Sequence, residues 1–250
     1  MTTEQYPISA SQIKTHSRCP LSYWYSYLSD KEPSKADNDY MKLGSRVHEA
    51  IEKVLLTSPD QDDVEHLKTR IIEVFALNEE YEIPDDLYQR GLECCETAAA
   101  FIEKERPSIV GVEERVGYDI NRPDISTPVT AIMDVCTETE IWDWKTGRIR
   151  EDSEHEERIQ GSVYMGAYYD KYGRPPERIR FVYLSEGKVR NLDPTDDNWS
   201  YMLTRAKRLL ESKHNNDYPA KPGPGCYWCE FEYWCHASPV GMGDVPWEDY

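Results

Sequence analysis

An aspartate and a lysine two residues apart lie between tryptophans in the segment IWDWKTG, residues 141–147. In a strand, side chains alternate between the two faces, so Asp143 and Lys145 point one way while Trp142 and Trp144 point the other. An ion pair explains this spacing. A metal site with a lysine beside it explains the spacing equally well.

A second aspartate, Asp134, occurs in the preceding apolar segment AIMDVC. If residues 128–136 and 139–145 form an antiparallel hairpin, opposite positions have numbers that sum to about 277, and Asp134 faces Asp143. Two carboxylates opposed at about 5 Å repel each other unless a cation lies between them. Mg²⁺ and Mn²⁺ prefer such oxygen ligands, so the two aspartates and Lys145 suit metal-assisted hydrolysis of a phosphodiester. A solvated aspartate, or one paired with Lys145, is the alternative.

The spacing D-x₈-D-x-K resembles the core of the PD-(D/E)XK nuclease superfamily. Three more segments resemble RecB-like nucleases: GSRVHEAIE their G-x-x-x-H-E helix, QGSVYMGAYY their Q-x-x-x-Y helix, and SQIKTHSRCPLSYWYSYL their opening with a Cys-Pro pair. The resemblance implies that a metal ion is held by His48, Asp134, Asp143 and the carbonyl oxygen of Trp144. It also implies that Lys145 positions the attacking water.

Four other positions bear on this resemblance. Gln160 and Tyr164 lie four apart on one face of a predicted helix, where the resemblance implies a place near the site and ordinary packing is the alternative. Glu113 resembles an acid that the family often carries on its first core strand, although the neighbouring Glu114 leaves the register open. The family commonly has glycine where this chain has Ala131, which narrows the space for substrate backbone.

Seven cysteines, an odd number, point to metal binding or catalysis before disulfides in an intracellular protein. The segment CYWCEFEYWC spaces Cys226, Cys229 and Cys235 as C-x₂-C-x₅-C, and three thiols need a fourth ligand. The arrangement resembles the 4Fe-4S subgroup of RecB-like nucleases, found in the AddB nuclease and the CRISPR-associated RecB-like exonucleases, which implies Cys19 as that ligand. The cluster would close a loop of about 207 residues. Zinc in the same thiols is the alternative, and the other cysteines are expected in the core: Cys94, Cys95 and Cys136.

Acidic residues outnumber basic ones by 47 to 29, which gives a formal net charge of -18. Such a surface repels nucleic acid at low salt. Because the acids are spread along the chain, the charge favours a halophilic source, where salt screens the repulsion. The sequence has no run of about 20 apolar residues and no signal-peptide pattern, so we expect a cytoplasmic protein with no membrane span.

Hydrophobic periodicity predicts an α/β fold. Helices are expected after Ser9 or Ser11 and over about 40–57, 62–81, 86–106, 156–172 and 195–213. Strands are expected over about 110–120, 128–136, 139–145, 178–185 and 188–192. In the first of these, the even-numbered residues Val112, Val116 and Tyr118 are expected to share one face.

The resemblance implies a restriction-endonuclease-like core, with a mixed central sheet flanked by helices. We expect one domain over residues 1–250, divided into a mainly helical region at 1–107, the nuclease core at 108–213 and a Cys-rich iron-sulfur tail at 214–250.

These features predict a metal-dependent DNA exonuclease that acts on single strands or duplex ends, with Mg²⁺ or Mn²⁺ and a 4Fe-4S cluster. Tyr23, Trp24 and Tyr25 are candidates for base stacking or for the core, which is favoured for Trp24. The rival interpretation is a non-catalytic or complex-dependent DNA-binding or assembly subunit in repair, replication or CRISPR adaptation. The sequence contains no P-loop, so a helicase or a CRISPR adaptation partner would be a separate protein.

Overall fold

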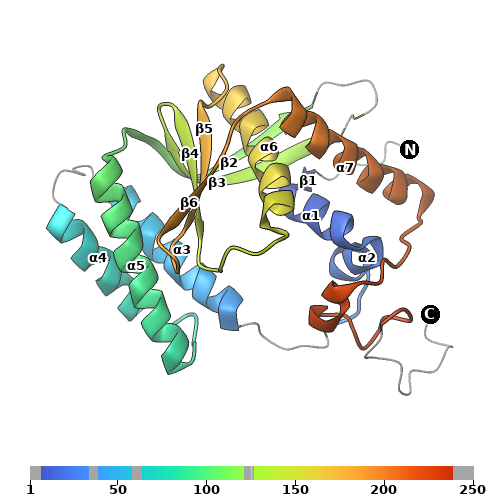
Figure 1. The fold of residues 1–250 in the computed structure, drawn as a ribbon, viewed down its shortest axis with the longest axis horizontal. Coiled ribbons are helices and arrows are strands. Elements are labelled where there is room, and N and C mark those ends of the chain that lie inside the picture. Colours follow the sequence, from blue (N-terminus) through green and yellow to red (C-terminus); the bar gives the residue numbers. More distant parts are fainter. Residues whose placement is uncertain (1–6, 34–38, 58–63, 121–124, 126, 239–250) are drawn as a thin grey trace.

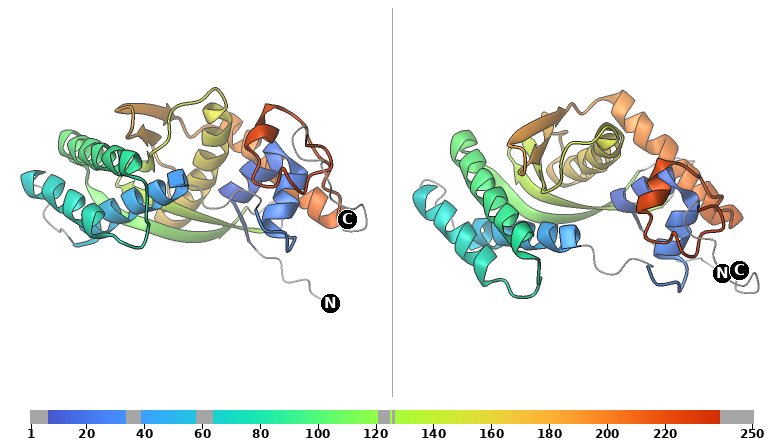
Figure 2. Two further views of the ribbon diagram at one scale, coloured as in Figure 1. Left: turned by 90° about the horizontal axis from the view of Figure 1, so that it is seen from below. Right: turned by 60° about the horizontal axis from the view of Figure 1, so that its bottom comes forward.

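The computed structural model describes residues 7–33, 39–57, 64–120, 125 and 127–238. These residues form an α/β fold in which helices cover a mixed six-stranded sheet (Figures 1 and 2). Parts of the predicted organisation lie outside the described residues: 1–6 of the helical region, 62–63 of the second long helix and 239–250 of the tail. No helix in the described ranges is long and apolar enough to cross a membrane.

The helices and strands agree with the predicted ones to within about four residues at each end. The helices are α1 (Ala10–Arg18), α2 (Pro20–Tyr27), α3 (Asp39–Thr57), α4 (Val64–Leu77), α5 (Asp85–Glu105), α6 (Ser153–Tyr172), α7 (Asp196–Asn215) and the 3₁₀ helix η1 (Pro224–Trp228). The strands are β1 (Ile8–Ser9), β2 (Ile109–Asp119), β3 (Pro128–Thr137), β4 (Glu140–Lys145), β5 (Arg178–Tyr183) and β6 (Lys188–Leu192). The two-residue β1, helix α2 and the 3₁₀ helix η1 were not predicted as separate elements. Ser9 caps α1, because its hydroxyl accepts a hydrogen bond from the backbone N–H of Gln12 at 3.3 Å.

Strand β3 is the centre of the sheet. The antiparallel β2 runs along one edge of β3, and β1 and β4 share the other edge. The parallel β1 pairs at Val129 and Thr130, whereas the antiparallel β4 pairs at Val135 and Cys136. Val135 lies opposite Trp142, which confirms the predicted register of the hairpin. Beyond β4, β5 continues the sheet in parallel and β6 in antiparallel orientation.

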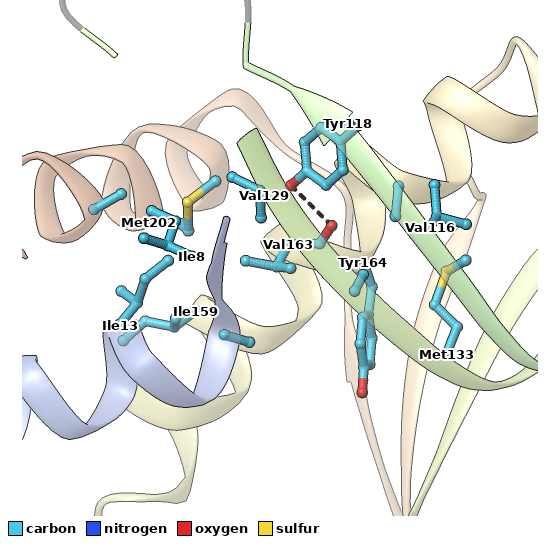
Figure 3. Close-up of a cluster of buried hydrophobic side chains, with 14 of the residues drawn as sticks. Ile8, Ile13, Val116, Tyr118, Val129, Met133, Ile159, Val163, Tyr164 and Met202 are labelled. Atoms are coloured by element: carbon cyan, nitrogen blue, oxygen red, sulfur yellow. Dashed lines mark hydrogen bonds between the residues drawn. The ribbon is translucent and has the colours of Figure 1, made fainter. Parts of the chain in front are cut away.

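Two hydrophobic clusters hold the helices against the sheet. One packs α1, α6 and α7 against β2 and β3, and the other packs α3, α4 and α5 against β4 and β5. Figure 3 shows the first cluster, in which the Tyr118 hydroxyl donates a hydrogen bond to the carbonyl oxygen of Val163 at 3.0 Å. The ring of Tyr164 lies in the same cluster, but its hydroxyl points away from the apolar side chains (Figure 3). Ala131 is buried there too and packs with the core.

The even-numbered side chains of strand β2 switch from one face of the sheet to the other at Glu113. Val112 packs with the cluster that contains α3, α4 and α5, whereas Val116 and Tyr118 belong to the cluster with α1, α6 and α7. Glu113 has a φ of 49°, in the left-handed region, which interrupts the alternation of a regular strand. The prediction that these even-numbered residues share one face is therefore wrong.

The Cys-rich tail lies beside α2 (Figures 1 and 2). The Tyr25 hydroxyl donates a hydrogen bond to the carbonyl oxygen of Trp234 at 2.7 Å, and its ring stacks on Phe231 at 5.3 Å between centroids. Tyr23 and Tyr25 are only 1% and 4% exposed, so of the two predicted alternatives they belong to the core and are not available for base stacking, whereas Trp24 is half-buried. These contacts tie residues near the start of the chain to the tail.

A buried histidine joins α1 to α7. His16 is 6% exposed, its Nε2 lies 3.0 Å from the Ser212 hydroxyl, and its ring meets Tyr23 edge-on. A hollow beside it is lined by Arg208, Glu211 and Asp217, among others. Burial lowers the pKa of His16 from 6.5 to about 4, so the folded protein keeps the ring neutral.

We expect acidification to destabilise the fold through His16. Between its ordinary pKa of 6.5 and its folded pKa of about 4, the unfolded chain binds a proton that the folded chain does not. The free energy of unfolding therefore falls as the pH falls through this window, and His16 accounts for about 2 kcal/mol of the loss by about pH 5. Urea unfolding near pH 7 and pH 5 should show a smaller loss for His16→Gln than for the wild type. Equal losses in both proteins would show that other groups cause the acid sensitivity.

Candidate metal centre

Strands β3 and β4 separate next to Asp134. Their paired residues are Val135 with Trp142 and Cys136 with Ile141. One step further, the backbone N–H of Trp144 donates to Oδ2 of Asp134 at 2.8 Å. The Asp134 carboxylate thus accepts a hydrogen bond that a backbone carbonyl would accept in a regular antiparallel pair. This bond holds the carboxylate between the two strands.

Asp134 meets His48 and Glu113 at this point. Their ligand atoms all lie within 4.8 Å of one another, and no other described histidine, cysteine or acid belongs to a set this compact. Nδ1 of His48, on α3, lies 3.5 Å from Oδ2 of Asp134. The left-handed conformation of Glu113 brings its carboxylate to the same place, whereas Glu114 forms an ion pair with Lys171 on α6. The structure thus settles which of the two glutamates faces the aspartate.

The protonation of these groups reflects burial and mutual repulsion. Burial raises the pKa of Glu113 to about 7, with a further contribution from the charge of Asp134. Burial and the charge of Asp143 raise the pKa of Asp134 well above its ordinary value. Burial lowers the pKa of His48, which favours the neutral imidazole that binds metals. His48 is also hydrogen-bonded to the backbone of Trp144, which places that backbone beside the three side chains. A divalent cation would relieve the repulsion between the carboxylates.

Asp143 lies outside this compact set and is held from the other side of the sheet. Its side chain is 2% exposed, and Oδ2 lies 2.6 Å from Nζ of Lys145. Oδ1 accepts hydrogen bonds from Nε2 of Gln160 and from the Tyr164 hydroxyl, both at 2.8 Å. The side chains that the sequence places on β4 and α6 therefore meet at the Asp143 carboxylate: Lys145, Gln160 and Tyr164. Burial lowers the pKa of Lys145, but the charge of Asp143 more than offsets this effect, so the net direction is upward.

Lys14 is a further member of the site that the sequence did not reveal. It lies on α1, which packs against α6, and its Nζ donates to Oε1 of Gln160 at 3.0 Å. The sequence offers no signal for this role, because the contact joins residues 146 positions apart.

The seven cysteines fall into two groups. Cys94, Cys95 and Cys136 are buried, as predicted for core thiols, and burial raises the pKa of each. Cys19, Cys226, Cys229 and Cys235 are partly exposed. Burial raises the pKa values of Cys229 and Cys235, and the charge of Cys19 raises them further. Cys19 is therefore close to the tail, although it lies near the start of the chain.

Two backbone groups also approach these sulfurs. The N–H of Lys221 points at the sulfur of Cys19, and the N–H of Gly223 points at that of Cys226, both at 3.4 Å. Such hydrogen bonds are common around cluster-bound thiolates. The four thiols do not form a set within 4.8 Å of one another in the described ranges. A zinc ion with Zn–S bonds of about 2.3 Å would draw them to within about 4 Å, whereas an iron-sulfur cubane is larger.

Comparisons with known proteins agree with this geometry. The model of one family, described as the PD-(D/E)XK nuclease superfamily, matches residues 7–236. A search of curated proteins finds no significant match.

Solved structures show a similar fold. A crystal structure from Eubacterium rectale, of a protein provisionally described as an exonuclease, superimposes with a TM-score of 0.56 at 14% identity, over 98% of this chain and 92% of that one. The structure of SSO0001 superimposes with a TM-score of 0.48 at 13% identity, over 96% of this chain and 91% of that one. At 14% identity, the likeness to the Eubacterium rectale protein concerns the fold.

Proposed function

Because the chain belongs to the PD-(D/E)XK nuclease superfamily, we propose that it is a metal-dependent DNA exonuclease that acts on single strands or duplex ends. The observation that supports this best is the buried pair of carboxylates, Asp134 and Asp143, beside Lys145. Burying two acids that repel each other costs free energy, and a cation between them removes that cost. In this proposal residues 1–250 form one domain.

The donor atoms fit a hard divalent cation. His48, Glu113 and Asp134 would hold Mg²⁺ or Mn²⁺ together with Asp143 and the carbonyl oxygen of Trp144. Most of these ligands are oxygens, and the histidine is neutral, as Mg²⁺ and Mn²⁺ sites require. When bound, the ion would polarise the phosphate and lower the pKa of a water molecule.

The surrounding side chains have separate roles. Lys145 is placed to orient the attacking water and to offset negative charge on the phosphate, while Gln160 and Tyr164 fix the Asp143 carboxylate that pairs with it. In the net reaction the oxygen of water bonds to phosphorus and the bond from phosphorus to a sugar oxygen breaks. The proton of the water ends on that sugar oxygen.

We also propose a 4Fe-4S cluster held by Cys19, Cys226, Cys229 and Cys235. The proximity of Cys19 to the tail supports these four residues as one ligand set. The C-x₂-C-x₅-C spacing, which resembles that of the 4Fe-4S subgroup, supports iron-sulfur over zinc. The cluster is a structural link in this proposal, since its cysteines lie at the end of α1 and in the tail, whereas Asp134 lies on β3.

The test of the function is degradation of end-labelled single-stranded DNA. Anaerobically purified protein with Mg²⁺ or Mn²⁺ in high salt should release label, and Asp143→Ala should be slower by at least about a thousandfold. Comparing labels at the two ends gives the polarity of digestion. Asp197→Ala is the matched control, because its side chain is 88% exposed and pairs with Arg158 at the surface.

Two outcomes would contradict the proposal. If neither the wild type nor Asp143→Ala cuts under any metal or salt, while both bind DNA equally, the protein is a non-catalytic or complex-dependent subunit. Equal cutting by both would place the active site elsewhere. A helicase or CRISPR adaptation protein added to an inactive sample separates the complex-dependent case from the non-catalytic one.

A further inference from the structure

Two lysines from distant parts of the chain converge on one neutral oxygen. Nζ of Lys14 and Nζ of Lys145 each lie 3.0 Å from Oε1 of Gln160. Lys145 is paired with Asp143, whereas the contact of Lys14 with Gln160 is to an uncharged amide. A half-buried ammonium group is stabilised far better by an anion than by an amide oxygen.

The separation of the two ammonium groups fits a phosphate. Because both nitrogens contact the same oxygen, they are at most about 6 Å apart. Two charge-assisted hydrogen bonds of about 2.8 Å can reach different oxygens of one phosphate across such a gap. We propose that Lys14 binds a non-bridging oxygen of the scissile phosphate, opposite Lys145. This inference rests on the proposed nuclease function and names a further residue that touches the substrate.

The local charge supports this role. The carboxylates of Glu113, Asp134 and Asp143 and the two lysines leave one net negative charge when all are ionised. One divalent cation changes this to one net positive charge, which a phosphodiester neutralises. Without Lys14, the site with its divalent cation would have no net charge. On a chain of net charge -18, this lysine thus decides whether the site attracts a phosphate.

Two neighbouring acids have basic partners, although Arg150 also pairs with Asp152 at 3.1 Å. Glu156 is paired with Arg150 at 3.4 Å, and Glu157 with Arg190 at 3.1 Å. A hollow of about 240 Å³ opens beside Lys145 and Gln160, and both basic and acidic side chains line it: Arg148, Arg150, Glu156 and Glu157. This hollow leaves room for the strand next to the proposed phosphate position.

The protonation of Lys14 agrees with anion binding. Burial and the charge of Lys145 lower its pKa from 10.5 to about 8, so it is still mostly charged near neutral pH. A phosphate between the two ammonium groups would offset their repulsion.

The experiment compares Lys14→Met and Lys14→Arg with the wild type. A purely structural role for Lys14, in which it only orients Gln160, would leave the salt dependence of DNA binding unchanged. We therefore measure binding of a fluorescent oligothymidylate with Ca²⁺ across a salt titration, and kcat/KM with Mg²⁺. Lys14→Met should lose on the order of 100-fold in kcat/KM, and its log–log salt slope should fall by about 0.7. Lys14→Arg, which keeps the charge, should recover most of both.

Lys68→Met is the control, since Lys68 pairs with Glu96 on the surface and its loss changes the net charge equally. Wild-type cutting and slope in Lys14→Met would overturn the proposal, as would equal losses in Lys14→Met and Lys14→Arg. If Lys14→Met fails to fold, Lys14→Gln replaces it, because its amide can still donate to Gln160. A wild type that binds but does not cut refutes the nuclease function instead, and the salt slope still tests Lys14.

Discussion

Replacing Asp134 with asparagine should abolish DNA cleavage and, in the metal-free protein, raise the melting temperature. Asp134 is 8% exposed, and both burial and Asp143 oppose its negative charge. Asparagine has the same shape, and its carbonyl oxygen can still accept the hydrogen bond from the N–H of Trp144. Removing the charge should stabilise the apo protein by about 1–2 kcal/mol, or about 3–6 °C, while cleavage falls at least about a thousandfold.

Thermal unfolding with and without Mn²⁺ checks both parts of this expectation. Mn²⁺ should raise the melting temperature of the wild type and have little effect on Asp134→Asn, because a ligand stabilises only the state that binds it. Asp119→Asn, an exposed change at the end of β2, should behave as the wild type in both assays. If Asp134→Asn melts lower than the wild type without metal, the aspartate stabilises the fold and the argument from repulsion is wrong.

Of all these variants, Cys19→Ser should cause the largest fall in the free energy of unfolding. In the proposed cluster, Cys19 closes a loop of about 207 residues. Opening such a loop costs on the order of 5 kcal/mol if the chain-entropy treatment of cross-links applies to a cluster. The variant should also lose the visible charge-transfer absorption and the bound iron and sulfide of the wild type.

Cys136→Ala is the matched control for this experiment. That thiol is buried in the core, so its loss should cost some stability but leave the iron content unchanged. Bound zinc in the wild type would replace the iron-sulfur assignment with a zinc site. Unchanged metal content in Cys19→Ser would remove Cys19 from the ligands altogether.

Local signals in the sequence were enough to predict most elements of the fold. Ser9 and Gly173 mark a helix start and a helix end because a capping hydroxyl and a residue free to adopt positive φ leave recognisable patterns. The hairpin register followed from the length of its turn, and it placed Val135 opposite Trp142 as observed. The two-residue β1 is too short to have a period, which is why it was missed.

The candidate site was harder to predict because it depends on contacts between distant segments. The motifs named Asp134, Asp143 and Gln160, but Lys14 reaches Gln160 only after α1 has packed on α6. Glu113 and Glu114 are indistinguishable by type, and a regular strand gives no reason for one of them to adopt a left-handed conformation. Alternation alone therefore could not show which of the two faces Asp134.

Helix α1 connects the proposed cluster to the proposed phosphate position. Lys14 lies within its nine residues, and Cys19 is its C-terminal cap. If the proposed cluster is destroyed by oxygen, the damage would first reach the end of this helix, and through it the side of the site that faces the phosphate. His48 lies on α3, which packs in the other hydrophobic cluster, and would be spared. Oxidation would then lower the affinity for DNA before the catalytic ion is lost.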